Sequence, residues 1–484
     1  MGHIPPKILT GTFVSSLGRT LGTLLSIATI AVVTRALVSA NGKDQGVLEY
    51  GVYASVFAFL SIVTIFADGG FYLIFTREAS KESADEKKLL ETVWLLRLAA
   101  IAFTVVVSLT VLFFIPYSLE VKKGVSVAIL GMCFQLGSQL LMGVFQKRLK
   151  LFVPAFAEVF SRAIQFGLVL LISLFAPSVT NFIWAFVISA FVCLLINVFG
   201  ASKFVPFKIW GSYDKNIARY VIKEALPMGV SLALSVIFFK VDSLMLSIMK
   251  SPEALAYYAL PYKVLESLLF FPSLVGGLLL PVLSKASSKD AKNVQEPLRA
   301  ASDLYLMGAI PITIILLITS SWVIFILGGK SFSPSIPVLN VLSVALGVLF
   351  LGNLYGNTIV AIGKQKLLVL VYLLLTVLNI GLNLIFIPKY SFMGAAWVTL
   401  ITELFSVLFA AFILLKNKIR IIGTENTFGI MLSGLLMLAL AFIPAHLVWR
   451  LTLSISGFLI CLFWTRAITV NKLRNLLMAQ IYDA

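Results

Sequence analysis

Runs of about 20 apolar residues recur from one end of this chain to the other, and they decide what it can fold into. A helix of that length crosses the roughly 30 Å of hydrocarbon in a bilayer. Composition agrees, because 60% of the 484 residues are hydrophobic and only 12% are charged, against about 25% charged residues in a soluble domain. The sequence therefore predicts an all-α polytopic membrane protein and disfavours a soluble enzyme or a disordered chain.

The apolar runs divide into about 14 predicted transmembrane helices, separated by short polar connections. Each is long enough to cross the bilayer, some of them with tilt. The first run exceeds the roughly 7–15 apolar residues of a signal peptide, so we expect it to remain as a span. The predicted helices cover about 8–38, 48–75, 92–115, 124–146, 151–176, 179–200, 220–246, 256–283, 303–328, 334–362, 367–387, 391–415, 427–444 and 448–468.

The connections carry most of the basic residues, and they carry them unevenly. If the N-terminus lies inside, about 25 Lys and Arg residues fall in inside segments and about 8 in outside segments. Cytoplasmic loops show this excess, which predicts an N-in, C-in protein of the cytoplasmic (inner) membrane. The loops thus explain the net charge of +17, and we expect no nucleic-acid partner.

Few residues could support catalysis or metal binding. The three cysteines all lie in apolar runs, and the two histidines, His3 and His446, lie near opposite ends of the chain. This pattern predicts neither a disulfide framework nor a metal site. A membrane acyltransferase would need an intramembrane histidine base, and ATP binding would need a phosphate-binding loop motif, but the sequence contains neither. We therefore expect a protein that is not an enzyme and has no cofactor.

The two halves of the chain resemble each other weakly but in a consistent order. Val32–Ser55 resembles Phe238–Leu260 at an offset of about 207 residues, which aligns Tyr50 with Tyr257. Such repeats are common in secondary transporters, whose substrate site lies between the halves. The predicted parts are a six-helix lobe at 1–200, a cytoplasmic linker at 201–218, a second six-helix lobe at 219–416, and two further helices with a cytoplasmic tail at 417–484.

Charged side chains inside the predicted spans are the candidate functional residues, because a charge in hydrocarbon is costly and usually faces the bundle interior. Arg19 and Arg162 lie near the middle of their spans. Arg97 lies about 8 Å from a helix end at 1.5 Å per residue, so we expect it to reach water by snorkelling. The pairs Glu158–Arg162 and Lys263–Glu266 have the i,i+4 and i,i+3 spacing of salt bridges.

Proline and glycine mark where spans bend. The eighth predicted span contains three prolines and is expected to hinge, although static kinks that suit packing are the alternative. The bend candidates are Pro227, Pro261, Pro272, Pro281, Pro311, Gly69–Gly70 and Gly276–Gly277.

Five motifs together resemble one known family, over most of the first twelve spans. They are T-R-x-L…E-Y-G-x-Y-A at Thr34–Ala54, A-D-x-G…R-E at Ala67–Glu78, V-D-S-L-M-L-S at Val241–Ser247, Y-x-x-P-Y-K-V-L-E…P…P-V-L-S-K at Tyr258–Lys285, and G-A-A-W-V-T-L-I-T-E at Gly394–Glu403. The chain is similar to polysaccharide flippases, the polysaccharide-transporter branch of the multidrug/oligosaccharidyl-lipid/polysaccharide exporter superfamily.

This resemblance implies two six-helix lobes around a central cavity. It also implies a flippase that translocates polyprenyl-diphosphate-linked oligosaccharide by alternating access, for the biosynthesis of O-antigen-like surface polysaccharide. Members of this branch commonly have twelve spans, whereas a count of fourteen resembles that of lipid II flippases. A lipid II flippase is therefore the first alternative function, and a multidrug/cation extruder is the second. The implied partners are the lipid-linked substrate, membrane lipids, a polysaccharide polymerase and glycosyltransferases. H⁺ or Na⁺ is the expected coupling ion, and a monomer is the expected working state.

A diphosphate requires cations in the cavity, where Arg binds through paired hydrogen bonds and Lys acts as a point charge. The predicted diphosphate-binding residues are Arg19, Arg162, Lys240 and Lys263. An acid that binds an ion with different affinity in two states could bias the transport cycle. The predicted ion-coupling residues are Asp68, Asp242, Glu266 and Glu403. The basic residues near mid-span argue against a cation extruder, which would instead need acids and aromatic rings.

Overall fold

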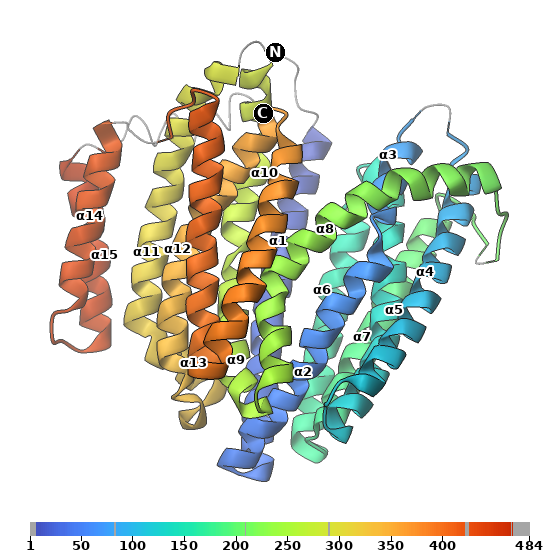
Figure 1. Ribbon diagram of the computed structural model, residues 1–484, viewed down its shortest axis with the longest axis horizontal. Helices are drawn as coiled ribbons and strands as arrows, with labels where there is room; N and C mark the ends of the chain where they lie inside the picture. Colours follow the sequence, from blue (N-terminus) through green and yellow to red (C-terminus); the bar gives the residue numbers. More distant parts are fainter. Residues whose placement is uncertain are drawn as a thin grey trace. The chain divides into compact units, whose positions relative to one another are not determined.

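The computed structural model describes residues 6–81, 84–208, 210–288, 291–421, 425–465 and 467, without the side chains of 6–17, 19, 291–292 and 425. The described chain is helical, with no strand in those ranges (Figure 1). The helices are α1 (Pro6–Asn41), α2 (Lys43–Asp68), α3 (Phe71–Ala79), α4 (Glu86–Phe114), α5 (Leu119–Lys147), α6 (Phe152–Phe175), α7 (Val179–Ser202), α8 (Lys215–Met249), α9 (Pro252–Leu268), α10 (Phe270–Ser287), η1 (Ala291–Val294), α11 (Gln295–Gly328), η2 (Lys330–Phe332), α12 (Ser335–Ala361), α13 (Gln365–Lys416), α14 (Glu425–Ala441) and α15 (Leu447–Trp464).

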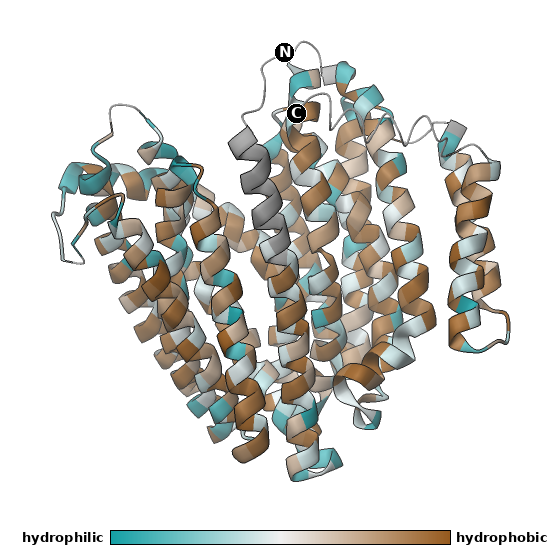
Figure 2. Cartoon of the chain, turned by 180° about the vertical axis from the view of Figure 1, so that it is seen from behind, coloured by the Kyte–Doolittle hydropathy of each residue, from teal (hydrophilic) through white to brown (hydrophobic). Residues whose placement is uncertain are grey.

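The helices have the length and composition of a polytopic membrane protein, as predicted. Within the described residues, 12 segments are long and apolar enough to cross a bilayer, and α14 is a shorter apolar helix. Large apolar side chains such as Phe103, Phe113 and Phe175 are more than 70% exposed, which suits a lipid-facing surface. Figure 2 shows apolar residues along the helix shafts and hydrophilic residues gathered at helix ends.

One of these segments, α13, contains two of the predicted spans joined without a loop. Its 52 residues include a single non-helical residue, Ser391, with φ 52° and ψ −133°. Gly394 lies so close to the carbonyl of Phe386 that an added Cβ would be 2.4 Å from its oxygen. The two halves of α13 therefore fold back on each other and form two apolar passes. With this second pass of α13 and with α14, the described chain has the predicted fourteen apolar passes.

Two further predicted spans are each built from two helices. The second span is α2 followed by α3, interrupted at Gly69–Gly70, and the eighth is α9 followed by α10, interrupted at Leu269. The second predicted span, 48–75, is therefore present and breaks at Gly69–Gly70, one of the predicted bend positions.

By their contacts, the residues divide into two compact units: an N-terminal unit, Ile4–Ala259, and a C-terminal unit, Leu260–Ala484. In the N-terminal unit, α5 packs along α7, α1 along α6, and α2 against both α5 and α8. Its core includes Val56, Val125, Met132 and Ile183, all buried. A second cluster, which includes Phe75, Leu90 and Phe145, fills the space near α3 and the start of α8.

In the C-terminal unit, α12 packs against α11 and against α13, and α14 pairs with α15. The α14–α15 hairpin joins the unit through apolar contacts with α11, which involve Ile314, Met437 and Phe458. Asp303 of α11 is buried and accepts a hydrogen bond of 2.8 Å from the Thr427 hydroxyl at the start of α14. The two C-terminal helices thus have both apolar and polar attachment to the rest of this unit.

Candidate functional site

The interruption in the second span creates the most distinctive polar site of the N-terminal unit. Helix α2 ends at Asp68, and Gly69 and Gly70 follow with φ of 52° and 75°, both in the left-handed region. Glycine enters this region without the strain that a Cβ would cause, so the pair ends one helix and starts another. A helix end inside an apolar bundle leaves carbonyl groups without helical partners, and these need donors from elsewhere.

Arg97 of α4 supplies those donors. Its guanidinium donates to the carbonyls of Asp68 and Ala67 at 2.6 and 3.3 Å, and it forms an ion pair of 2.7 Å with the Asp68 carboxylate. The opposite side donates to Gln139 at 2.9 Å and to the Leu136 carbonyl at 3.2 Å, both on α5. A cation at the C-terminus of α2 also compensates the negative end of the helix dipole. Arg97 thereby joins α2, α4 and α5.

The prediction that Arg97 snorkels is wrong, since this side chain is 1% exposed. Distance to the helix end is not decisive here, because the protein provides acceptors at the depth where the guanidinium lies. The sequence signal that could have indicated this site is Asp68-Gly69-Gly70, an acid followed by two glycines inside an apolar run.

The interrupted span packs against a second irregular helix, α8, which contains Pro227. A Cβ on Gly70 would lie 3.1 Å from the Ala225 oxygen, and one on Gly229 would lie 2.9 Å from the Gly69 oxygen. The backbones therefore touch where both helices depart from regular geometry. Pro227 cannot donate a helical hydrogen bond. This paired irregularity is a suitable place for α8 to pivot against α2 and α3.

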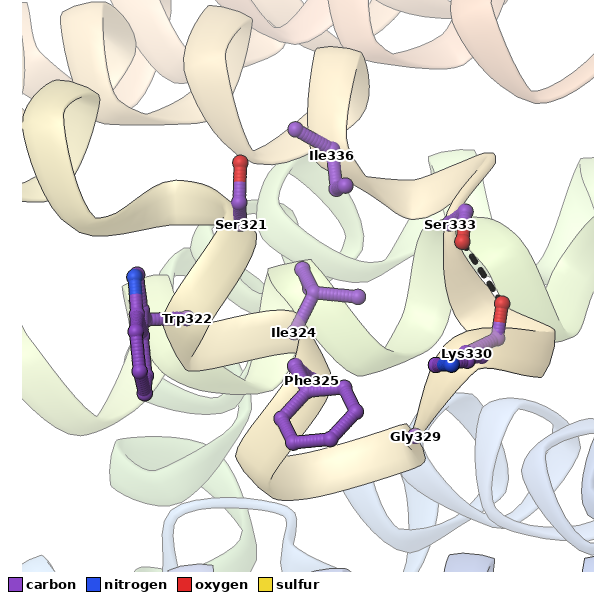
Figure 3. Close-up of a pocket in the computed structure, with 8 residues that line it drawn as sticks. All are labelled: Ser321, Trp322, Ile324, Phe325, Gly329, Lys330, Ser333 and Ile336. Atoms are coloured by element: carbon purple, nitrogen blue, oxygen red, sulfur yellow. Dashed lines mark hydrogen bonds between the residues drawn. The ribbon is translucent and has the colours of Figure 1, made fainter.

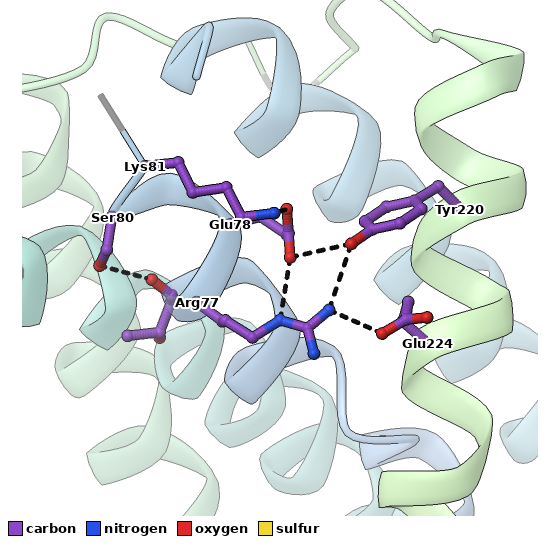
Figure 4. A network of polar contacts seen from close by, with 7 residues as sticks. Arg77, Glu78, Ser80, Lys81, Tyr220 and Glu224 are labelled. Carbon is purple, nitrogen blue, oxygen red and sulfur yellow. Dashed lines mark hydrogen bonds and ion pairs between the residues drawn. The ribbon is translucent and has the colours of Figure 1, made fainter. Parts of the chain in front are cut away.

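Next to this contact, five polar side chains bind α3 to α8 (Figure 4). Arg77 forms ion pairs with Glu224 at 2.8 Å and with Glu78 at 2.9 Å. The Tyr220 hydroxyl donates to Glu78 at 3.1 Å, and Lys81 pairs with the same carboxylate. The bond to Glu78 raises the pKa of Lys81. We call Arg77, Glu78, Lys81, Tyr220 and Glu224 the α3–α8 clasp; sequence analysis missed it because its members are about 140 residues apart.

The predicted diphosphate-binding residues lie at separate places. Arg162 pairs with Glu158 at 2.9 Å, as their spacing predicted, and also donates to the Ser26 hydroxyl on α1. Lys263 pairs with Glu266 at 3.1 Å, again as predicted, in the C-terminal unit. Lys240 is half-buried on α8. Arg19 lies on α1, but its side chain is outside the described residues.

The predicted ion-coupling acids also differ in their surroundings. Asp68 is bound to Arg97, and Glu266 to Lys263. Asp242 is 2% exposed, and the Tyr258 hydroxyl lies 3.4 Å from its carboxylate. Glu403 is 3% exposed on the second half of α13, next to Thr402, whose hydroxyl lies 3.5 Å from the Asn379 amide of the first half.

Two cavities are found away from these residues. One in the C-terminal unit has a volume of 360 Å³ (Figure 3), and Lys330 is the one charged residue among those that line it. It is lined by Ser321, Trp322, Ile324, Phe325, Gly329, Lys330, Ser333 and Ile336. The other, of 550 Å³, is polar and lies in the N-terminal unit between the start of α4 and residues 208–212. Neither contains a predicted site residue, and the described residues hold no cluster of three or more metal-ligating side chains.

Comparison with solved structures defines the fold. The fold matches a lipid II flippase MurJ in an inward closed conformation, with a TM-score of 0.74, 18% identity and coverage of 96% of this chain and 99% of that one. It also matches an inward-facing multidrug resistance MATE family transporter of the MOP superfamily, with a TM-score of 0.63, 13% identity and coverage of 83% and 95%. The chain thus has the fold of these membrane transporters.

Sequence comparison then gives the family. A profile of the family described as "Polysaccharide biosynthesis protein" matches residues 8–287, and the chain belongs to this family. A putative O-antigen transporter from Shigella flexneri is 28% identical over 170 residues, which are 35% of this chain and 40% of that relative. The chain therefore aligns with less than half of that relative's length. These findings confirm the resemblance to the polysaccharide-transporter branch.

Proposed function

We propose that this protein is a flippase that translocates polyprenyl-diphosphate-linked oligosaccharide across the cytoplasmic membrane, for O-antigen-like polysaccharide biosynthesis. The family match over residues 8–287 is the observation that carries this proposal. The aligned O-antigen transporter and the transporter fold support it. An N-in, C-in monomer working with a polymerase and glycosyltransferases fits this role.

Among the basic residues within spans, Arg162 is the diphosphate ligand that its geometry favours. Its side chain is 37% exposed; one side of the guanidinium binds Glu158, and the other binds the Ser26 hydroxyl of α1. A diphosphate could displace the Glu158 carboxylate, because phosphate and carboxylate accept the same paired hydrogen bonds from Arg. Arg97 is a poor candidate, since it is fully buried. Arg19, Lys240 and Lys263 remain proposed ligands.

Burial separates the proposed ion-coupling residues. A salt bridge to a buried arginine favours a structural role for Asp68. Asp242 and Glu403 are 2% and 3% exposed, and a buried carboxylate is sensitive to proton or cation binding. We propose these two, with Glu266 as a third, for coupling to H⁺ or Na⁺.

A lipid II flippase is the second candidate function. The fold likeness to MurJ covers 96% of this chain, including both units. Both substrates share a polyprenyl diphosphate and differ in the sugar, so residues that bind the diphosphate cannot distinguish them. The cation extruder is less well supported, because the family match points to polysaccharide biosynthesis.

Reconstitution in liposomes tests the proposal. Movement of a fluorescent polyprenyl-diphosphate oligosaccharide between leaflets is measured for the wild type and for Arg19→Ala, Arg162→Ala and Arg162→Lys. The matched control is Arg35→Ala, which removes an exposed charge from the same helix as Arg19. We expect the alanine variants to lose movement, the lysine variant to keep part of it, and the control to keep it all.

Parallel vesicles with fluorescent lipid II and with an organic cation identify the substrate class. Movement of lipid II alone would favour the second candidate. Cation efflux without lipid movement would contradict both flippase functions.

A further inference from the structure

The connection between α7 and α8 forms a rigid surface of basic and aromatic side chains at one end of the N-terminal unit. We propose that residues 203–208 and 210–226, the interfacial segment, bind the headgroups of anionic phospholipids and so attach α8 to the membrane surface. This inference does not depend on which substrate the protein carries. Figure 1 shows α8 bending, so that its first part runs obliquely to the rest of the helix, and Figure 2 shows the hydrophilic character of this end of the unit.

The first observation is that the segment is fixed in place. The Glu91 carboxylate, 3% exposed, accepts hydrogen bonds from the backbone N–H groups of Lys208 at 3.0 Å and Ser212 at 2.8 Å. Phe207 packs on Trp94, with ring centroids 5.6 Å apart. Asp214 caps α8 and pairs with Lys88 at 2.7 Å. A surface that is already ordered loses little conformational entropy when it binds a ligand.

The second observation is what this fixed backbone exposes. Trp210 is 81% exposed and Tyr213 is 57% exposed. An exposed indole next to a phenol is unusual in water, but Trp and Tyr are enriched at the membrane interface, where their rings meet the acyl boundary and their polar atoms meet headgroups. The aromatic side chains therefore indicate the depth at which the segment lies.

The third observation is the order of residues along the exposed face of α8. Lys215, Arg219, Ile222 and Leu226 are all exposed and share one stripe, at i, i+4, i+7 and i+11. Ala218, Val221 and Ala225 are buried on another face. On this exposed side the basic residues extend to Lys223, and the side chain that follows them, Leu226, is apolar and 67% exposed, as on a helix that passes from headgroups into hydrocarbon.

The fourth observation is charge. Lys203, Lys208, Lys215, Arg219 and Lys223 are exposed, and within the described part of the chain none of these five side chains forms an ion pair. The two acids of the segment are already neutralised, Asp214 by Lys88 and Glu224 by Arg77. Asp85 is the exposed acid next to Lys208 and Trp210. The cations of this surface outnumber its anions, which matches anionic lipids.

The test uses the full-length protein in neutral detergent micelles doped with phosphatidylglycerol or, as the zwitterionic probe, phosphatidylcholine. Ligand binding to the folded state raises Tm. The segment variant carries Lys203→Gln, Lys208→Gln, Lys215→Gln and Arg219→Gln. The control variant carries Lys364→Gln, Lys366→Gln, Lys416→Gln and Lys418→Gln, four exposed charges of the C-terminal unit.

We expect phosphatidylglycerol to raise the Tm of the wild type and the control variant more than phosphatidylcholine does. The segment variant should lose most of this difference, and added salt should weaken it in the wild type. Trp210→Ala with Tyr213→Ala should instead reduce the effect of both lipids. If the segment variant is already unstable in phosphatidylcholine, the single variants Lys208→Gln and Arg219→Gln should each remove a smaller part.

Three results would overturn the inference. The segment variant could keep the full difference, or the control variant could lose as much, which would show an effect of net charge alone. Alternatively, a short-chain polyprenyl diphosphate could replace phosphatidylglycerol while the latter has no effect, which would make the surface a substrate site.

Discussion

The second and eighth spans are both interrupted, but by different means. In the second span, two left-handed glycines separate α2 from α3, and the buried Arg97 donates hydrogen bonds to the carbonyls that lack helical partners at the end of α2. In the eighth span, Leu269 between α9 and α10 keeps helical φ and ψ of −62° and −14°, and Pro272 follows in the first turn of α10. The first interruption is a true break, whereas the second is a kink.

The two interruptions require different contacts from the neighbouring helices. At the kink, backbone bonds continue across Leu269, from Leu269 to Leu265 at 3.1 Å and from Ser273 to Leu269 at 3.3 Å. The Tyr305 hydroxyl of α11 adds a single neutral contact, donating to the Pro272 carbonyl at 2.9 Å. At the break, two carbonyls and a carboxylate converge, and a cation with several donors is needed.

The comparison predicts its largest effect at Arg97. Arg97→Leu leaves Asp68 and the end of α2 without their donor inside the bundle, and it should destabilise the protein by about 3–5 kcal/mol. The matched change at the kink, Tyr305→Phe, removes one neutral donor and should lose about 1–2 kcal/mol. Unfolding in detergent, followed by denaturant or by Tm, measures both.

Adding Asp68→Leu to Arg97→Leu should recover part of the loss, because the partly buried carboxylate that lacked its cation is then removed as well. Equal losses for Arg97→Leu and Tyr305→Phe would contradict the distinction between break and kink.

The next effect concerns glycine. Gly70→Ala places a Cβ at φ 75°, 3.1 Å from the Ala225 oxygen, so strain and contact together should lose about 2 kcal/mol. Gly277→Ala, in helical α10 with nothing within 4 Å of the new Cβ, should gain about 0.5–1 kcal/mol. The same unfolding measurement compares them, and a neutral Gly70→Ala would show that α2 and α8 separate easily.

The sequence alone predicts most of this fold but little of the site. Spans, their number and the local pairs Glu158–Arg162 and Lys263–Glu266 follow from hydropathy and spacing, which are local properties. The positions of bends follow too, since Gly69–Gly70 and Pro272 are visible in the sequence. The kind of bend does not, because it depends on Arg97 meeting Gln139 and Leu136 of α5, and on Arg77 meeting Glu224. Those contacts join segments that only tertiary packing brings together.

A smaller effect should distinguish the clasp from a local pair. Arg77 and Glu224 are 46% and 37% exposed, so solvent weakens their attraction, and a double-mutant cycle with Arg77→Gln and Glu224→Gln should give about 0.2–1 kcal/mol. The cycle for Lys263 and Glu266 on one helix should give about 0.3–0.5 kcal/mol. A flipping assay tests the role of the clasp: if it joins moving elements, its loss should change the transport rate, and an unchanged rate in the Arg77–Glu224 cycle would contradict that.

The smallest effect is expected from a change of pH, which acts on Asp214 of the interfacial segment and on Lys81 of the α3–α8 clasp. Hydrogen bonds from Lys88 and from the backbone of Ile217 and Asn216 lower the pKa of Asp214 from its usual 3.8 to about 2. This contribution is present above pH 3.8 and is lost as pH falls toward 2. The raised pKa of Lys81 acts in the opposite direction: its contribution is present below the usual 10.5 and is lost at higher pH.

The Tm difference between wild type and Asp214→Asn should therefore stay constant from about pH 5 to pH 9 and shrink only in stronger acid. The corresponding difference for Lys81→Gln should shrink only in strong base. Asp214 and Lys81, which attach α8 to its neighbours, therefore keep their charges at physiological pH. A transport rate that depends on pH in that range would therefore not arise from these two attachments. A clear change in either Tm difference near pH 7 would instead place the pH-sensitive group at the start of α8.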